Sequence, residues 1–99
     1  MPTDWHQRDD KARMPTISVF YGIVVRMFFD DHSPAHFHAL YGEFQATIDI
    51  ERLRVLEGDL PRRALELVFD WAELHQAALL DNWRRCRTKQ HPHRIEPLV

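Results

Sequence analysis

Cysteine and glycine are scarce in this chain, and each scarcity excludes a class of site. Cys86 is the only cysteine among 99 residues, which excludes an internal disulfide framework and a zinc site made of several thiolates. The three glycines, Gly22, Gly42 and Gly58, are isolated turn glycines by sequence and form no phosphate-binding loop. No apolar run approaches the roughly 20 residues that a membrane-spanning helix requires. We therefore expect a reduced, cytoplasmic protein without a membrane segment.

An excess of basic residues is also missing. Lysine and arginine number 13 against 15 acidic residues, which gives a formal net charge of −2. Domains that bind by neutralising phosphates usually carry a basic face, so this balance argues against such a protein but is compatible with a small RNA-directed enzyme. The densest basic group outside the N-terminus, Arg84, Arg85 and Arg87, suits the negative end of a helix dipole. These arginines could also lower the pKa of Cys86, but we expect this thiol to be a spectator.

The N-terminus differs in composition from the rest of the chain. Residues 1–13 are strongly polar and lack the apolar core of a secretory signal. Such a stretch buries little area to offset its ordering entropy, so we expect a disordered extension; a short helical arm that docks through Trp5 is the alternative. Met14 begins an apolar-rich pattern and is a candidate alternative translation start. Residues 14–99 are predicted to form one domain.

Segments with strand character fill the first half of this domain. The candidate strands are residues 17–20, 23–29, 36–41, 44–50 and 54–56. They are rich in β-branched and aromatic residues, and the fourth alternates apolar with polar side chains, as a half-buried antiparallel strand does. The first two are one interrupted strand if Gly22 does not turn the chain. If these two count as one strand and residues 54–56 add a further short one, the sheet has four strands. We therefore predict a small antiparallel sheet of three to four strands.

The second half is helical. Pro61 is a helix start signal, and neither proline nor glycine interrupts residues 62–87. Apolar side chains on this segment form two adjacent stripes, an arc wider than the ~100° that one sheet would cover. Either the helix bends and folds back, or its second face meets another chain. Residues 95–98 could then lie back on the sheet. The predicted fold class is α+β, with one long C-terminal helical segment packed on the sheet.

Three histidines and two acids lie within nine residues, at 30–38 (DDHSPAHFH). No packed core needs such a density of titratable side chains. His36 and His38 are two apart and therefore point to the same face of a strand, where they could hold one divalent metal ion. His32, Asp30 or Asp31 could add the third ligand. The spacing matches no standard metal motif, so we expect no cofactor but keep a divalent metal on His32, His36 and His38 as an alternative.

General acid–base chemistry is the second interpretation of the same residues. Histidine titrates near neutrality, so His32, His36 or His38 beside Asp31 could move a proton at cellular pH. An RNA-directed enzyme of this kind would also need a cation for the phosphate. Arg26, Arg62 and Arg63 are the candidates for that helper role.

A binding surface without catalysis is the third interpretation. Phe37 would face the core while His36 and His38 lie on the solvated face and contact a partner. Aromatic side chains are enriched at protein interfaces, so the nearby Tyr41 fits such a surface. His75, alone on an apolar helix face, is expected to be a core histidine and not a ligand.

The ordered series of motifs resembles a bacterial family catalogued as domain of unknown function 4160. The motifs that carry the resemblance are residues 14–18, 20–23, 31–32, 34–39, 48–50, 58–61, 71–75, 82–83 and 95–98. One departure is Ala35, where the family usually has a second proline before His-Phe-His. The resemblance implies a small cytoplasmic bacterial protein, often encoded beside another small protein in the manner of toxin–antitoxin pairs. It supplies no established catalytic residue.

Together these observations lead to one hypothesis and two alternatives. The hypothesis is one component of a two-protein, toxin–antitoxin-like module that binds a small protein partner, or a second copy of itself, through the helix. In that case the cluster His32, His36 and His38, with Asp31, Arg62 and Arg63 as helpers, could act on RNA. The first alternative is a non-enzymatic protein-binding or metal-binding module. The second is a metal-dependent hydrolase that would bind zinc or manganese stoichiometrically. The residues alone leave open whether the protein is an enzyme.

Overall fold

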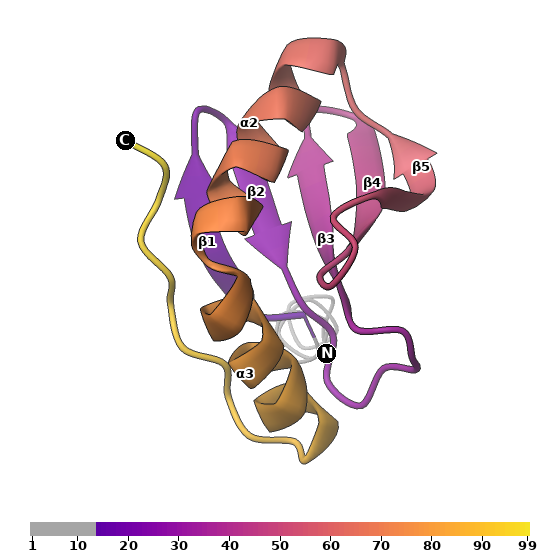
Figure 1. Ribbon diagram of the computed structural model, residues 1–99, viewed down its shortest axis with the longest axis vertical. Coiled ribbons are helices and arrows are strands. Elements are labelled where there is room, and N and C mark those ends of the chain that lie inside the picture. Colours follow the sequence, from indigo (N-terminus) through magenta and orange to yellow (C-terminus); the bar gives the residue numbers. More distant parts are fainter. Residues whose placement is uncertain (1–13) are drawn as a thin grey trace, which may run out of the picture.

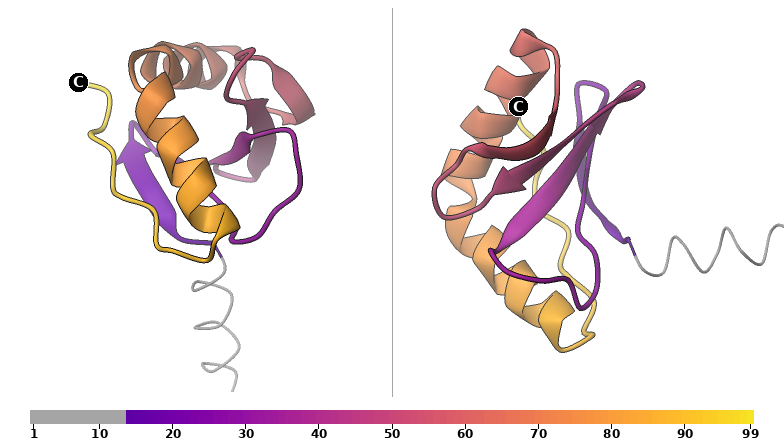
Figure 2. Two further views of the ribbon diagram at one scale, coloured as in Figure 1. Left: turned by 60° about the horizontal axis from the view of Figure 1, so that its bottom comes forward. Right: turned by 90° about the vertical axis from the view of Figure 1, so that its right-hand side faces the viewer.

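The computed structural model describes residues 14–99, so the predicted extension over residues 1–13 lies outside the described residues. The described part is an antiparallel sheet with two consecutive helices on one face (Figures 1 and 2). The predicted α+β class is confirmed. Among residues 14–99, no helix is long and apolar enough to cross a membrane.

The sheet has five strands, more than the three to four predicted. The strands are β1 (Thr16–Phe20), β2 (Ile23–Arg26), β3 (His36–Tyr41), β4 (Phe44–Asp49) and β5 (Val55–Asp59). They follow one another in the sheet in chain order, each antiparallel to the next. Tyr21 and Gly22 both have positive φ, 50° and 81°, so they turn the chain and separate β1 from β2.

The last strand extends further than the sequence indicated. Residues 54–56 were the predicted strand, whereas β5 continues to Asp59. Gly58 pairs with Ala46 inside the sheet, and a Cβ there would clash with the carbonyl oxygen of Gln45. Gly58 is therefore a strand glycine that allows close approach of two backbones, and its interpretation as a turn glycine was wrong.

The predicted single long helix is two helices, α2 (Arg62–Leu74) and α3 (Gln76–Arg87), separated at His75. The backbone of His75 has φ −120° and ψ 23°, which is outside the helical range. The Gln76 side chain donates to the carbonyl oxygens of Ile50 at 2.7 Å and Glu51 at 3.1 Å. This break allows both apolar stripes to reach the core, since Trp71 of α2 and Leu79 of α3 are both fully buried.

The core lies between the helices and one face of the sheet. Trp71 packs against Phe20 and Phe37, with ring centroids 5.2 and 5.7 Å apart. Its indole N–H also donates to the Glu96 carbonyl at 2.8 Å, which holds the C-terminal tail. The Ile95 N–H donates to a carbonyl of β1 at 2.8 Å, so the tail lies along that edge of the sheet, as predicted (Figure 1). Within residues 14–99, the outer edge of β5 is left without a strand partner.

Candidate metal centre

The two buried histidines stand at the start of β3, on the face opposite Phe37. Phe37 points to α2, so strand alternation directs His36 and His38 to the other face. The prediction that they lie on a solvated face was wrong, because His36 is only 4% and His38 only 9% exposed. Trp83 of α3 packs against the His36 ring at 5.0 Å, and Phe28 meets the His38 ring edge-on at 4.6 Å.

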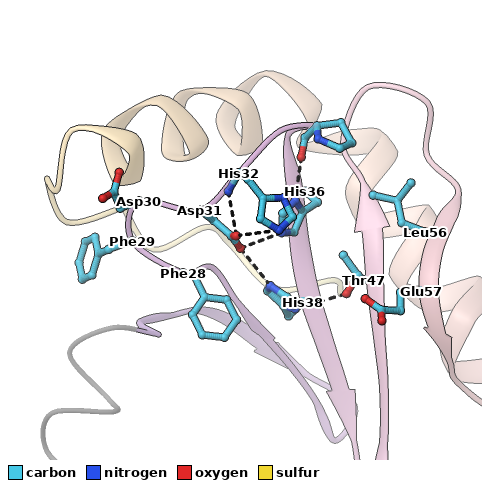
Figure 3. Close-up of a pocket in the computed structure, with 11 residues that line it drawn as sticks. Phe28, Phe29, Asp30, Asp31, His32, His36, His38, Thr47, Leu56 and Glu57 are labelled. Carbon is cyan, nitrogen blue, oxygen red and sulfur yellow. Dashed lines mark hydrogen bonds and ion pairs between the residues drawn. The ribbon is translucent and has the colours of Figure 1, made fainter.

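The loop before β3 adds a carboxylate to the pair. Asp31 Oδ2 lies 2.9 Å from His36 Nε2 and 3.7 Å from His38 Nε2 (Figure 3). Each of these three residues offers one ligand atom, and all three atoms lie within 4.8 Å of one another. The His32 side chain is 88% exposed, and its Nε2 lies 3.8 Å from the other oxygen of Asp31. The third donor beside His36 and His38 is therefore Asp31, and His32 lies outside this group.

The hydrogen bonds of His36 define how its ring is used. Nδ1 lies 2.7 Å from the Pro34 carbonyl oxygen, which can only accept a hydrogen bond, so Nδ1 carries a proton. Nε2 faces the carboxylate of Asp31, a second acceptor. A neutral imidazole has one N–H. The ring therefore either carries both protons or directs an Nε2 lone pair, together with Asp31, at a cation.

His38 Nε2 has no hydrogen-bond partner although it is buried. On the other side of the ring, Nδ1 has a long contact of 3.5 Å with Thr47 Oγ1. Burial lowers the pKa of His38, and the neighbouring His36 lowers it further; Asp31 and Glu57 act in the opposite direction without outweighing them. The neutral ring is favoured, with a lone pair available for a metal ion or a proton.

The Asp31 carboxyl is held in its charged form. Burial by itself would raise the pKa of Asp31, but the His32 N–H bond and the charge and hydrogen bond of His36 lower it below its ordinary value. The His32 N–H donates to Oδ1 at 2.8 Å, which leaves Oδ2 directed at the two histidines. One carboxylate and two imidazoles thus converge.

This geometry fits a metal ion with small side-chain adjustments. Two donors about 2.1 Å from one ion at a tetrahedral angle lie about 3.4 Å apart. The observed separations from Asp31 Oδ2, 2.9 and 3.7 Å, bracket that value. The Pro34 carbonyl that orients His36 is the type of outer hydrogen bond that metal-bound histidines usually make. Three protein ligands with open positions are typical of catalytic zinc and non-haem iron sites.

The donors open onto a cavity of about 660 Å³. Its lining residues are Phe28, Phe29, Asp30, Asp31, His32, Pro34, His36, His38, Thr47, Leu56 and Glu57 (Figure 3). Three of them are acidic and none is lysine or arginine. The cavity therefore favours a cation over an anion.

The arginines named as helpers lie in different places. Arg62 and Arg63, at the start of α2, pair with Glu66 at 3.4 and 3.2 Å and do not line this cavity. Arg26 is the partner of His38 across the β2–β3 pair. The structure thus brings Arg26, and not Arg62 or Arg63, beside the histidines.

Sequence reasoning missed several residues that line the cavity. Glu57 comes shortly before the helix start in the sequence, but it lies on β5, opposite Thr47 of β4. Thr47 alternates with the buried Ala46 and Ile48, a pattern that could have placed it on the histidine face. Phe28 was assigned to a strand, whereas β2 ends at Arg26 and Phe28 lies in the loop against His38.

Comparisons with known proteins agree with the resemblance in the sequence. No curated protein and no solved structure gives a match. Residues 22–84, which include Asp31, His36 and His38, match a protein family as a continuous segment. The chain belongs to the family described as Domain of unknown function (DUF4160).

Proposed function

We propose that this protein binds a divalent transition-metal ion through Asp31, His36 and His38 and uses it for hydrolysis in the adjoining cavity. The observation that carries the proposal is the buried, unpartnered Nε2 of His38 beside an already oriented Asp31–His36 pair. A buried polar atom without a partner costs free energy, which a bound ion would recover. Imidazole and carboxylate ligands suit zinc, iron or manganese.

A metal-free acid–base enzyme acting on phosphates is a weaker interpretation of this cavity. Asp30, Asp31 and Glu57 line it, and no lysine or arginine does. These carboxylates repel the negative charge of a phosphate, and Asp31 is the one that faces the histidines. A divalent ion on the three donors would offset that repulsion.

The chain's own residues supply the remaining chemistry. A bound divalent ion would make water more acidic and polarise a substrate oxygen. The Pro34 carbonyl orients His36, and the His32 N–H orients Asp31. Glu57 is a carboxylate in the same cavity without a metal-ligand role, so we assign it the acceptance of a proton from water.

Metal binding can be tested with a matched pair of variants. Asp31→Asn removes one ligand charge, while Asp30→Asn removes the neighbouring charge, whose side chain points away from the histidines in Figure 3. Asp30 has φ 57°, a conformation that asparagine tolerates, so the control should fold. Isothermal titration with Zn²⁺, Mn²⁺ and Fe²⁺ should give a one-to-one complex with the wild-type protein.

We expect Asp31→Asn to weaken binding by more than about 100-fold, because even outer-shell changes at metal sites cost 10–100-fold. Asp30→Asn should bind within a few-fold of the wild type. Equal affinities for the two variants, or no binding by the wild-type protein, would remove the metal proposal.

A cytoplasmic two-protein module of toxin–antitoxin type is a second proposal, about the setting of this site. Tyr21, Tyr41 and Phe44 are exposed at the turns that join β1 to β2 and β3 to β4, and such aromatic side chains are enriched at interfaces. The unpaired edge of β5 is another surface that a partner chain could extend. Few apolar side chains of the helices are exposed, and Leu74 is the most exposed of them at 71%. The apolar area that the helices offer to a partner is therefore smaller than the sequence led us to expect.

Native mass spectrometry of the untagged protein from its own host tests the module. A complex with a second small protein would support it, and expression without that partner should then arrest growth if this chain is the toxin. His38→Ala should relieve the arrest if the site acts on RNA. A homo-oligomer or a monomer carrying only metal would argue against the module while leaving the metal site untouched.

A further inference from the structure

A row of polar side chains crosses the sheet on the face that carries the histidines. Pair by pair across the five strands, the row consists of Thr16, Arg26, His38, Thr47 and Glu57. Directly opposed residues in antiparallel strands direct their side chains to the same face, with Cβ atoms about 4.5–5.5 Å apart. The cavity includes the row from His38 to Glu57. Arg26 lies on the other flank of His38.

Arg26 carries an unused donor. Its Nε is buried and has no hydrogen-bond partner, although the residue as a whole is only half-buried. Within residues 14–99 the buried side-chain atoms without a partner are Ser18 Oγ, Arg26 Nε and His38 Nε2. Two of the three therefore belong to cross-strand neighbours. A guanidinium stays charged at any physiological pH, and leaving its N–H groups unpaired is costly.

We propose that Arg26 binds the anionic group of the substrate, and that this group is the phosphate of a phosphate ester. The inference rests on the proposed metal centre, because the ester would lie between the ion on His38 and the guanidinium beside it. The planar fork of arginine matches the oxygens of a phosphate. A phosphate oxygen would also supply the acceptor that Arg26 Nε lacks. Arginine and metal clamps on a transferring phosphoryl group are a general means of stabilising its charge.

The reaction is hydrolysis and needs no further reactant. The oxygen of a water molecule forms a bond to phosphorus, and the bond from phosphorus to the ester oxygen breaks. One proton of that water passes to the Glu57 carboxylate. The released alkoxide then takes up this proton from Glu57, directly or through water, so that an alcohol leaves and the carboxylate is restored. Arg26 takes no part in proton transfer and acts by holding the phosphate oxygens.

The test uses inorganic phosphate as the probe and two arginine variants. Arg26→Gln removes the proposed contact, and Arg62→Gln removes an arginine that is 93% exposed and pairs with Glu66. Phosphate is titrated into each manganese-loaded protein and followed by calorimetry, after circular dichroism has established that the variants fold. We expect phosphate affinity to fall about 10-fold or more in Arg26→Gln only, because hydrogen bonds to charged groups are among the stronger ones. Manganese affinity should be unchanged in both.

Two further measurements separate the possible failures. Arg26→Lys keeps the charge without the fork, so it should recover part of the phosphate affinity. Wild-type phosphate affinity in Arg26→Gln would overturn the Arg26 assignment and leave the metal centre standing. Failure of the wild-type protein to bind manganese, zinc or iron would overturn the metal centre and with it this inference.

Discussion

Pro34 and His36 are linked by a hydrogen bond of 2.7 Å from the imidazole Nδ1–H to the carbonyl oxygen. The two residues are only two positions apart, so the loop that leads into β3 orients the first histidine of that strand. Because Nδ1 is engaged, Nε2 is the ring nitrogen that faces Asp31. The geometry of the donor set is therefore largely built into one short segment of the chain.

This hydrogen-bond arrangement predicts the number of protons released when a metal ion binds. The lowered pKa of Asp31 leaves its carboxylate ionised at pH 7, and the lowered pKa of His38 leaves its ring neutral. The 2.9 Å hydrogen bond between His36 Nε2 and Asp31 Oδ2 contains one proton, which an ion bound to both atoms would displace. Calorimetry in buffers of different ionisation enthalpy should give release of about one proton per ion at pH 7.

The protonation of the two ring nitrogens of His36 provides a check on this number of released protons. If the ion binds through Nε2, nitrogen-detected NMR of the loaded protein should find a proton on His36 Nδ1 and none on Nε2. Release of two or more protons before any substrate is added, or a metal-bound Nδ1, would contradict the assignment of the ligand atoms.

The sequence indicated where the site lies but not how it is assembled. The density of histidines over residues 30–38 located it, and strand alternation placed His36 and His38 on one face. The burial of these histidines was missed because it comes from Phe28, which lies in a loop, and from Trp83, which is distant in sequence. The choice of Asp31 over His32 depends on the turn of the loop, which side-chain chemistry alone does not determine.

The fold was likewise predicted where local sequence patterns determine it and missed where long-range contacts do. Alternation and turn residues were enough to locate β1 to β4, apart from the end of β2, since these strands form two local hairpins. The break at His75 has no proline or glycine to mark it, and the contacts that hold it, from Gln76 to Ile50 and Glu51, are long-range. Tertiary contacts overrode a continuous helical pattern there.

Asn82 should be the main attachment of the C-terminal tail to α3. Its side-chain amide donates to the His93 carbonyl at 2.8 Å and accepts from the His93 N–H at 2.8 Å, and the residue is buried. Asn82→Ala removes both bonds, so we expect a loss of about 2–3 kcal/mol in the free energy of unfolding by urea. Asp81→Ala, at an exposed neighbouring position, should change it by less than about 0.5 kcal/mol. Equal stability of the two variants would mean that the tail contributes little.

Gln76 should stabilise the break between the helices. Gln76→Ala removes its donors to the carbonyls of Ile50 and Glu51, and we expect a loss of about 1 kcal/mol in unfolding free energy. The Ile50 N–H in turn donates to the Ala35 carbonyl at 3.0 Å, so faster amide exchange at Ile50 should accompany the loss. Gln90→Ala is the matched control because Gln90 is exposed. Unchanged amide exchange at Ile50 in Gln76→Ala would show that Gln76 does not stabilise the turn at Ile50 and Glu51.

Cys86 should be an unreactive thiol in the folded protein. Burial raises its pKa to about 11, and Arg85, which acts to lower the pKa, only partly opposes this. At pH 8 the thiolate fraction is then about 200-fold smaller than for a free thiol with a pKa near 8.5. A disulfide reagent such as dithionitrobenzoate should therefore label Cys86 slowly in the native state and rapidly in urea. Rapid labelling of the native protein would contradict the burial of this thiol.

The labelling rate of Cys86 also reports on the candidate metal centre. The Cys86 carbonyl accepts a hydrogen bond of 2.9 Å from the N–H of Asp30, the residue before the proposed ligand Asp31. Opening of α3 away from the loop exposes the thiol and breaks this contact, whereas an ion on Asp31 would stabilise the closed state. Adding Mn²⁺ at 100 times its dissociation constant should slow labelling by up to about 100-fold in the wild-type protein. The same ion concentration should have almost no effect on Asp31→Asn, and an equal slowing there would mean that manganese acts elsewhere on the protein.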